Sequence, residues 1–186
     1  DPTALVAVSW DKMDQAKTIV PRVCALNNTQ FMKGGSRLII SLIGVLVPAV
    51  HRNPIFYTVC EDQHHGADMV GGLLLDVLLQ VVLKVGCLPR RFFIQADNTA
   101  KETKNTIMIF VALWLLAKLE HTRLEVIEFG YLIVGHTHDL IDTIFSFVNR
   151  SLKHADFLSL PEMFAILETK MKVPPIWRHL QDVYDF

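Results

Sequence analysis

The sequence predicts an α/β domain with a mixed central sheet of about five strands and helices on both faces. Apolar runs of strand length come first along the chain, and segments with helical spacing then alternate with shorter strands. That order is typical of a sheet covered on both sides. The chain has 186 residues, of which 51% are hydrophobic and 20% charged. These values suit one folded domain and are unlike those of a disordered chain.

The first three extended segments predict a meander of strands. Residues 4–10 are apolar and β-branched, and residues 37–50 and 55–60 are further apolar runs. Consecutive strands usually lie beside each other in a sheet. We therefore expect the first strand near the sheet centre, beside the later strand that ends at Asp97.

The rest of the chain alternates between helices and strands. Apolar residues repeat at three and four positions over residues 66–85, which predicts a helix that ends at Gly86 and Pro89. A helix over 101–119 is apolar on nearly every side, so we expect it to be well buried. The other predicted elements are strands at 92–96 and 124–134 and helices at 139–152 and 161–171.

The predicted domain is single and spans 1–186, with a core at about 4–154 and a helical extension at 155–186. Because the chain begins at Asp1, we expect a fragment of a longer protein. Its three cysteines are widely spaced, which disfavours a disulfide framework or a cysteine zinc site. Residues 106–117 are too short to span a membrane and residues 69–88 too polar, so we expect a soluble domain without a membrane partner.

The formal net charge of −1 lowers the expectation of nucleic-acid binding, because such domains usually carry a basic excess. A core that gathers carboxylates around metal ions can escape this rule, since bound cations change the local field. Arg90 and Arg91 could contact phosphate, but we interpret them as part of a solvated face.

The segment FIQADNTAKETKN contains the first candidate site. A short apolar strand delivers Asp97 at its carboxyl end, where open α/β sheets bind ligands. A helix N-terminus that follows would favour phosphate, with Asn98, Lys101 and Lys104 as candidate nucleic-acid contacts. The alternative is that Asp97 or Asn98 only caps the helix.

The segment GHTHDLID contains the second candidate site. Asp139 and Asp142 are three positions apart and share one face near a helix N-terminus. His136 and His138 flank them, and such a group can ligate metal or transfer protons. The alternative is a capped helix start with surface histidines, since acidic residues are favoured there in any case.

Asp11, at the end of the first strand, is the third candidate. Asp14 competes with it, but the two would point to opposite faces of a continuous strand. We prefer Asp11 because it is nearer to the buried strand.

Taken together, these acids resemble those of the ribonuclease H-like superfamily, in its transposase and integrase branch. That branch carries an acidic triad on the first strand, the fourth strand and a late helix. The strings DKMDQAKT, QADNTAKETKN and VGHTHDLIDTIFS are similar to a transposase-like domain of eukaryotic mobile-element proteins. The resemblance implies Asp11, Asp97 and Asp142 as the triad, with Asp139 as an alternative to Asp142. Many such triads end in Glu, whereas this one would end in Asp.

The resemblance implies a nuclear enzyme that cuts or joins DNA with two Mg²⁺ or Mn²⁺ ions. Asp11 would bridge the ions, Asp97 and Asp142 would hold one each, and His136 or His138 would orient the nucleophile. DNA is then the partner, at mobile-element ends and target, and a homo-oligomer is possible. One alternative is an inactive, domesticated binding module. Another is a metal-dependent hydrolase of small molecules, which needs an enclosed pocket beside His136.

Overall fold

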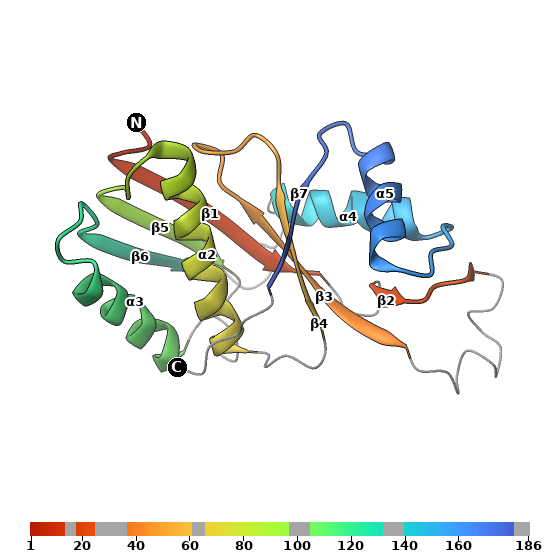
Figure 1. Cartoon of the computed structure of the whole chain (residues 1–186), viewed down its shortest axis with the longest axis horizontal. Coiled ribbons are helices and arrows are strands. Elements are labelled where there is room, and N and C mark those ends of the chain that lie inside the picture. The colour runs from red at the N-terminus through yellow and green to blue at the C-terminus, as the bar shows by residue number, and fades with distance from the viewer. Residues whose placement is uncertain (14–17, 25–36, 61–65, 97–104, 132–139, 181–186) are drawn as a thin grey trace.

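A computed structural model describes residues 1–13, 18–24, 37–60, 66–96, 105–131 and 140–180 of the chain (Figure 1). These residues form a mixed seven-stranded sheet. The order along the sheet is β6-β5-β1-β3-β4-β7, and the short strand β2 pairs with β3. The strands are β1 (Leu5–Lys12), β2 (Ile19–Val20), β3 (Leu38–Leu46), β4 (Ile55–Cys60), β5 (Arg91–Ala96), β6 (Val126–Tyr131) and β7 (Ile176–His179).

Strand β3 runs against its neighbours, and the other described pairs are parallel. It pairs antiparallel with β1, β2 and β4, whereas β5 is parallel to β1 and β6, and β7 is parallel to β4. The predicted meander of β1, β3 and β4 is therefore confirmed. The first strand also lies inside the sheet, between β3 and β5, as expected.

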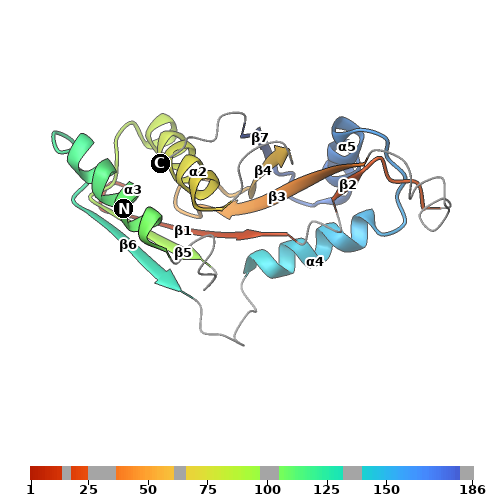
Figure 2. The same cartoon turned by 90° about the horizontal axis from the view of Figure 1, so that it is seen from below.

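The described helices lie on both sides of the sheet. In Figure 2, α2 and α3 lie on one side and α4 lies on the other. The helices are α2 (Ala67–Val85), α3 (Thr106–Lys118), α4 (Leu140–Leu152) and α5 (Leu160–Lys170). None of the helices among the described residues combines the length and the apolar character that a membrane crossing requires.

Helix α2 begins and ends at glycines. Gly66 has φ 108° and Gly86 has φ 86°, a region that side chains with a Cβ rarely adopt. The Gly86 N–H donates to the carbonyl of Val82 at 2.7 Å, which satisfies an otherwise free C-terminal acceptor. The predicted end of this helix at Gly86 is confirmed.

Two hydrophobic cores lie on the two faces of the sheet, as strand alternation requires. The first packs Val6, Val8 and Trp10 of β1 against buried residues of α2 and α3. The second packs alternate residues of β3 and β4, among them Leu42 and Phe56, against α4 and α5. Residues of β1 that neighbour Trp10 therefore face the side of α4.

The C-terminal extension is not entirely helical, contrary to the prediction. After α5, strand β7 pairs in parallel with β4 from Ile55↔Ile176 to Thr58↔His179. Trp177 stacks on Phe164 of α5 with ring centroids 4.0 Å apart, and its ring lies 5.3 Å from that of Phe56. Only four residues form β7, too few for an alternating pattern to stand out from the sequence.

The prediction that the second helix is well buried is wrong. Only Met108, Val111, Ala112 and Leu115 of α3 are buried, and five large apolar side chains are exposed. The helix lies at the β6 edge of the molecule, where it covers the sheet with one side only (Figure 1). An apolar residue on nearly every side of this helix therefore did not mean that every side of the helix is buried.

Candidate functional site

Asp11 lies at the carboxyl end of β1, on the α4 side of the sheet. Its neighbour Trp10 is 4% exposed and belongs to the opposite core, so alternation turns Asp11 to the other face. Asp11 is half-buried, and its Oδ1 accepts the backbone N–H of Lys12 at 2.7 Å. A carboxylate is thus presented where β1 meets α4.

Gly44 allows α4 to approach this position closely. It is the partner of Asp11 in the antiparallel ladder of β1 and β3. A Cβ on Gly44 would lie 3.0 Å from Cζ of Phe145 and 3.2 Å from Cγ1 of Ile141. Because those distances are shorter than ordinary contacts, glycine is what lets the first turns of α4 rest on β3 beside Asp11.

Asp142 follows Ile141 directly and lies in the first turn of α4. Helix α4 buries Ile141, Phe145, Val148 and Leu152 in the second core, which sets the orientation of the helix. The first turn carries the positive end of the helix dipole and so favours a carboxylate. Asp11 and Asp142 therefore belong to two elements that meet around Gly44.

The remaining predicted site residues lie outside the described residues. They are Asp97, Asn98, Lys101, Lys104, His136, His138 and Asp139, together with the alternative Asp14. Strand β5 ends at Ala96, one position before Asp97, as the sequence predicted.

Helix α3 starts later than predicted. Its N-cap is Asn105, whose side chain accepts the backbone N–H of Met108 at 3.0 Å. The cap of the described helix is therefore neither Asp97 nor Asn98. Lys101 and Lys104 precede this helix in the chain, so its N-terminus does not follow Asp97 directly.

Within the parts of the chain that the structure describes, no group of three or more His, Cys, Asp or Glu side chains could hold a metal ion. Of the predicted triad, Asp11 and Asp142 lie within those parts of the chain. Their donors are hard carboxylate oxygens, the type that Mg²⁺ and Mn²⁺ prefer.

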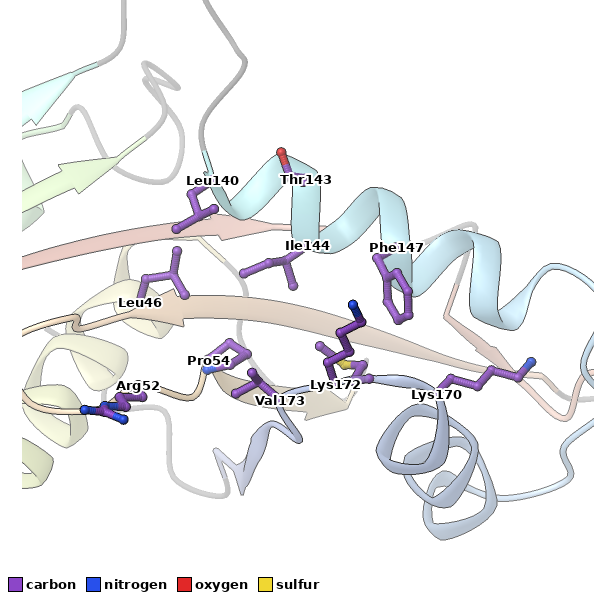
Figure 3. A pocket seen from close by; sticks show the side chains of 11 residues that line it. Leu46, Arg52, Pro54, Leu140, Thr143, Ile144, Phe147, Lys170, Lys172 and Val173 are labelled. Atoms are coloured by element: carbon purple, nitrogen blue, oxygen red, sulfur yellow. The ribbon is translucent and has the colours of Figure 1, made fainter.

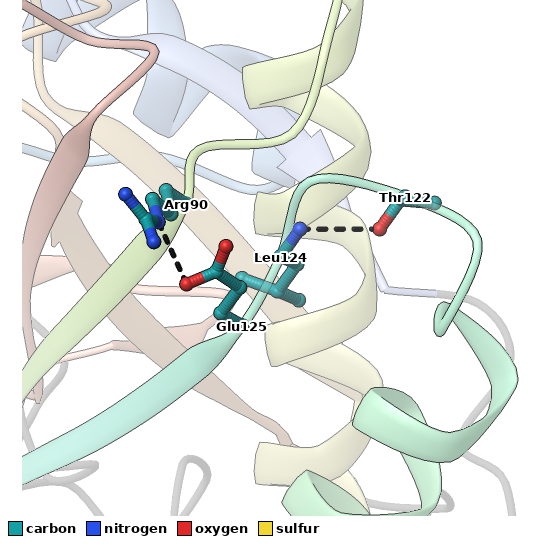
Figure 4. Close-up of polar contacts among 4 residues, drawn as sticks. All are labelled: Arg90, Thr122, Leu124 and Glu125. Carbon is teal, nitrogen blue, oxygen red and sulfur yellow. Dashed lines mark hydrogen bonds and ion pairs between the residues drawn. The ribbon is translucent and has the colours of Figure 1, made fainter.

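Arg90 and Arg91 are engaged in ion pairs at the opposite end of β5. Arg90 Nε lies 2.6 Å from Oε2 of Glu125 (Figure 4), and an Nη of Arg91 lies 2.5 Å from Oε1 of Glu128. The bond to Glu125 raises the pKa of the exposed Arg90. The two arginines join β5 to the start of β6, in agreement with their interpretation as a solvated face.

A polar cluster that the sequence analysis missed joins β4, α2 and β7. The Tyr57 hydroxyl donates to Oδ2 of Asp76 at 2.7 Å, and an Nη of Arg178 donates to Oδ1 of the same carboxylate at 2.7 Å. Burial, followed by the bond to Asp76, raises the pKa of Tyr57 well above its usual range. Asp76 appeared in the sequence only as a charge within an apolar helix.

An open groove runs between α4 and the segment that joins α5 to β7. It has a volume of about 510 Å³, within the usual range of ligand pockets. Figure 3 shows Leu140, Ile144 and Phe147 of α4 on one side, with Leu46, Pro54 and Val173 on the other. The cations Arg52, Lys170 and Lys172 also line it, and Nζ of Lys170 donates to the carbonyl of Ser151.

The groove does not test the small-molecule hydrolase. His136 and His138, which that alternative uses, lie outside the described residues. The described lining is apolar and basic apart from Thr143, and no carboxylate, histidine or cysteine is among the described residues that line the groove.

A model of one protein family matches residues 30–186 of the chain, and its description is Domain of unknown function (DUF7869). The chain belongs to this family. The DUF7869 match includes Asp97 and the GHTHDLID segment but begins after β1, so Asp11 lies before it. No curated protein matches the chain.

Proposed function

We propose that this DUF7869 domain is the catalytic core of a transposase- or integrase-like enzyme with a ribonuclease H-like fold, which cuts or joins DNA phosphodiester bonds. The sheet supports the fold assignment. An antiparallel meander comes first, its first strand lies inside the sheet, and strands β5 and β6 then alternate with helices. The superfamily's triad uses the first strand, the fourth strand and a late helix.

The register of β1 and β5 is the observation that carries the proposal. Paired residues of these parallel strands differ by 86 in number, from Leu5↔Arg91 to Ser9↔Gln95. Asp11 and Asp97 differ by the same 86. The carboxyl ends of parallel strands meet at one edge of a sheet, where α/β proteins bind ligands.

Helix α4 brings the third carboxylate to the same edge in this proposal. Its Ile141 and Phe145 contact the sheet at Gly44, the ladder partner of Asp11. Asp142 comes one residue after Ile141, whereas Asp139 precedes the described helix. This contact favours Asp142 over Asp139 as the acid of the late helix.

In the proposed mechanism, Asp11, Asp97 and Asp142 would hold two divalent cations, with Asp11 as the carboxylate shared between them. When bound, two Mg²⁺ or Mn²⁺ ions would activate the attacking water or 3′-hydroxyl and stabilise the leaving oxygen. The three carboxylates would hold the positive charge of the ions at the sheet edge, and His136 or His138 would orient the nucleophile. Asn98, Lys101 and Lys104 would contact the DNA backbone, and the resemblance to eukaryotic mobile-element proteins implies a nuclear location.

Nicking and strand transfer on plasmid DNA with Mg²⁺ test the proposal. We expect wild type to act and Asp97→Asn and Asp142→Asn to lose at least a hundredfold in rate, because each removes a metal ligand. Asp68→Asn in the first turn of α2 changes the same chemical group on the other side of the sheet and should retain activity. Equal activity in wild type and Asp97→Asn would defeat the assignment.

A second candidate function is an inactive, transposase-derived binding module. The net charge of −1 and the exposed apolar side of α3 favour it. It predicts no heat of binding when Mg²⁺ or Mn²⁺ is titrated into the wild-type chain. It also predicts no cleavage at any Mn²⁺ concentration.

A further inference from the structure

Helix α3 carries an apolar stripe on the side that faces away from the sheet. Five large side chains form it: Ile107, Ile109, Phe110, Leu113 and Trp114, exposed by 37%, 57%, 57%, 61% and 39%. Exposed apolar groups are normal when scattered, but a contiguous set on one helix marks an interaction surface. The stripe has no role in the proposed DNA chemistry.

The spacing of the stripe suits another helix. Its exposed positions recur at intervals of three and four, as in Thr106, Phe110, Leu113 and Ala117. Such spacing produces the seam along which two helices pack side by side. No charged residue occurs in α3 before Lys118.

The apolar surface of the stripe is a large part of what a stable interface needs. Its five side chains expose on the order of 500 Å², more than half of the roughly 800 Å² that each partner contributes to a standard interface. Helix α2, which contacts α3, also exposes Leu79 and Leu83.

We propose that the stripe is a dimer interface, in which α3 packs antiparallel against α3 of a second copy of this chain. The stripe is nearly symmetric about the point between Val111 and Ala112. An antiparallel pair centred there opposes Phe110 to Leu113 and Ile109 to Trp114 of the other copy, while the small residues Thr106 and Ala117 meet at the ends. A twofold interface requires this kind of self-complementarity.

Charge also favours a second copy. In the antiparallel arrangement Lys118 opposes the neutral Asn105, so the pair contains no opposed like charges. A net charge of −1 adds little repulsion between copies. Helices that bind lipid surfaces usually carry many Lys or Arg residues on their polar face, whereas α3 carries Lys118 alone.

Sedimentation equilibrium of the chain at tens of micromolar concentration tests the proposal. We expect a dimer for wild type, and for Leu113→Lys a dimer at least roughly tenfold weaker, because a charge enters the centre of the interface. Leu158→Lys places the same charge at an equally exposed leucine, 63% exposed and outside the stripe, and should leave the dimer unchanged. Circular dichroism confirms that each variant is folded.

A mixing experiment tests the antiparallel arrangement itself. Phe110→Glu and Leu113→Lys should each be monomeric alone, but a mixture should form heterodimers, because the introduced carboxylate of one chain would oppose the introduced ammonium group of the other. A monomeric wild type would overturn the proposal, as would a dimer that Leu113→Lys leaves intact. A mixture that stays monomeric would overturn the antiparallel arrangement.

Discussion

Gly44 is the residue on which the approach of α4 to β1 depends. Gly44→Ala would place a Cβ 3.0 Å from Cζ of Phe145, inside the buried second core. We expect a loss of about 1–3 kcal/mol in the free energy of unfolding, as for other overpacked sites. Denaturant unfolding measures it.

Gly130→Ala is the matched control for that variant. Its Cβ would meet the far end of Phe93, a half-exposed ring that can move toward solvent. The loss in unfolding free energy should therefore be smaller than for Gly44→Ala. If Gly44→Ala unfolds at the wild-type denaturant concentration, the close contact between α4 and β3 is wrong.

Because of Tyr57, the free energy of unfolding should decrease at alkaline pH. Burial and the bond to Asp76 raise its pKa in the folded state above the unfolded value of about 10. Its contribution to stability is then complete below about pH 10 and is lost as the pH rises above it. Tyr57→Phe should reduce stability at neutral pH and flatten the alkaline decline.

The absorbance of the phenolate form measures the ionisation of Tyr57 directly. In a titration of wild type, the signal that Tyr57→Phe lacks should appear only as the domain unfolds. Ionisation of Tyr57 near its ordinary pKa of about 10 in the folded protein would contradict the buried bond to Asp76.

The candidate site could be predicted from the sequence only as separate acids. Asp11 lies at the carboxyl end of β1, inside the strand rather than after it, and Asp142 lies in the first turn of a helix as expected. Gly44, where β3 meets α4 beside Asp11, gave no signal, because one glycine within an apolar run does not reveal which helix will pack on it. The same holds for Asp76, whose partners come from distant strands.

At the scale of elements, we expect the short strand β7 to depend on the aromatic contacts of Trp177. Trp177 lies between Phe164 and Phe56, and its Nε1 donates to Oε1 of Glu168 at 2.9 Å. We expect Trp177→Ala to cost about 2–4 kcal/mol, as truncation of a large aromatic side chain does. Thermal unfolding measures the loss, and an unchanged midpoint would contradict the role of this stack.

Elements with a clear period were predictable, and those that depend on context were not. The period of α2 and its terminal Gly86 gave nearly the observed bounds, and α4 and α5 start within one residue of their predicted starts. Strand β7 was missed because β4, rather than its own pattern, holds it in the sheet. Helix α3 was assigned to the core because hydrophobicity alone cannot distinguish a buried helix from one with an exposed apolar side.

At the scale of the whole molecule, the two faces of the sheet carry different features. One face, covered by α2 and α3, carries the larger core and the exposed stripe. The other face is covered in part by α4 (Figure 2). Asp11 lies there at the carboxyl end of β1, and Asp142 lies in the first turn of α4. A dimer formed through α3 would therefore leave the proposed catalytic edge of each copy accessible to DNA.

The central claim is that Asp11, Asp97 and Asp142 jointly hold divalent cations. Calorimetric titration of Mn²⁺ into the purified chain tests it most directly, without a need for the natural DNA substrate. We predict saturable binding by wild type, weakened at least tenfold in each of Asp11→Asn, Asp97→Asn and Asp142→Asn and unchanged in Asp68→Asn. No binding by wild type, or equal binding by all five proteins, would contradict the claim.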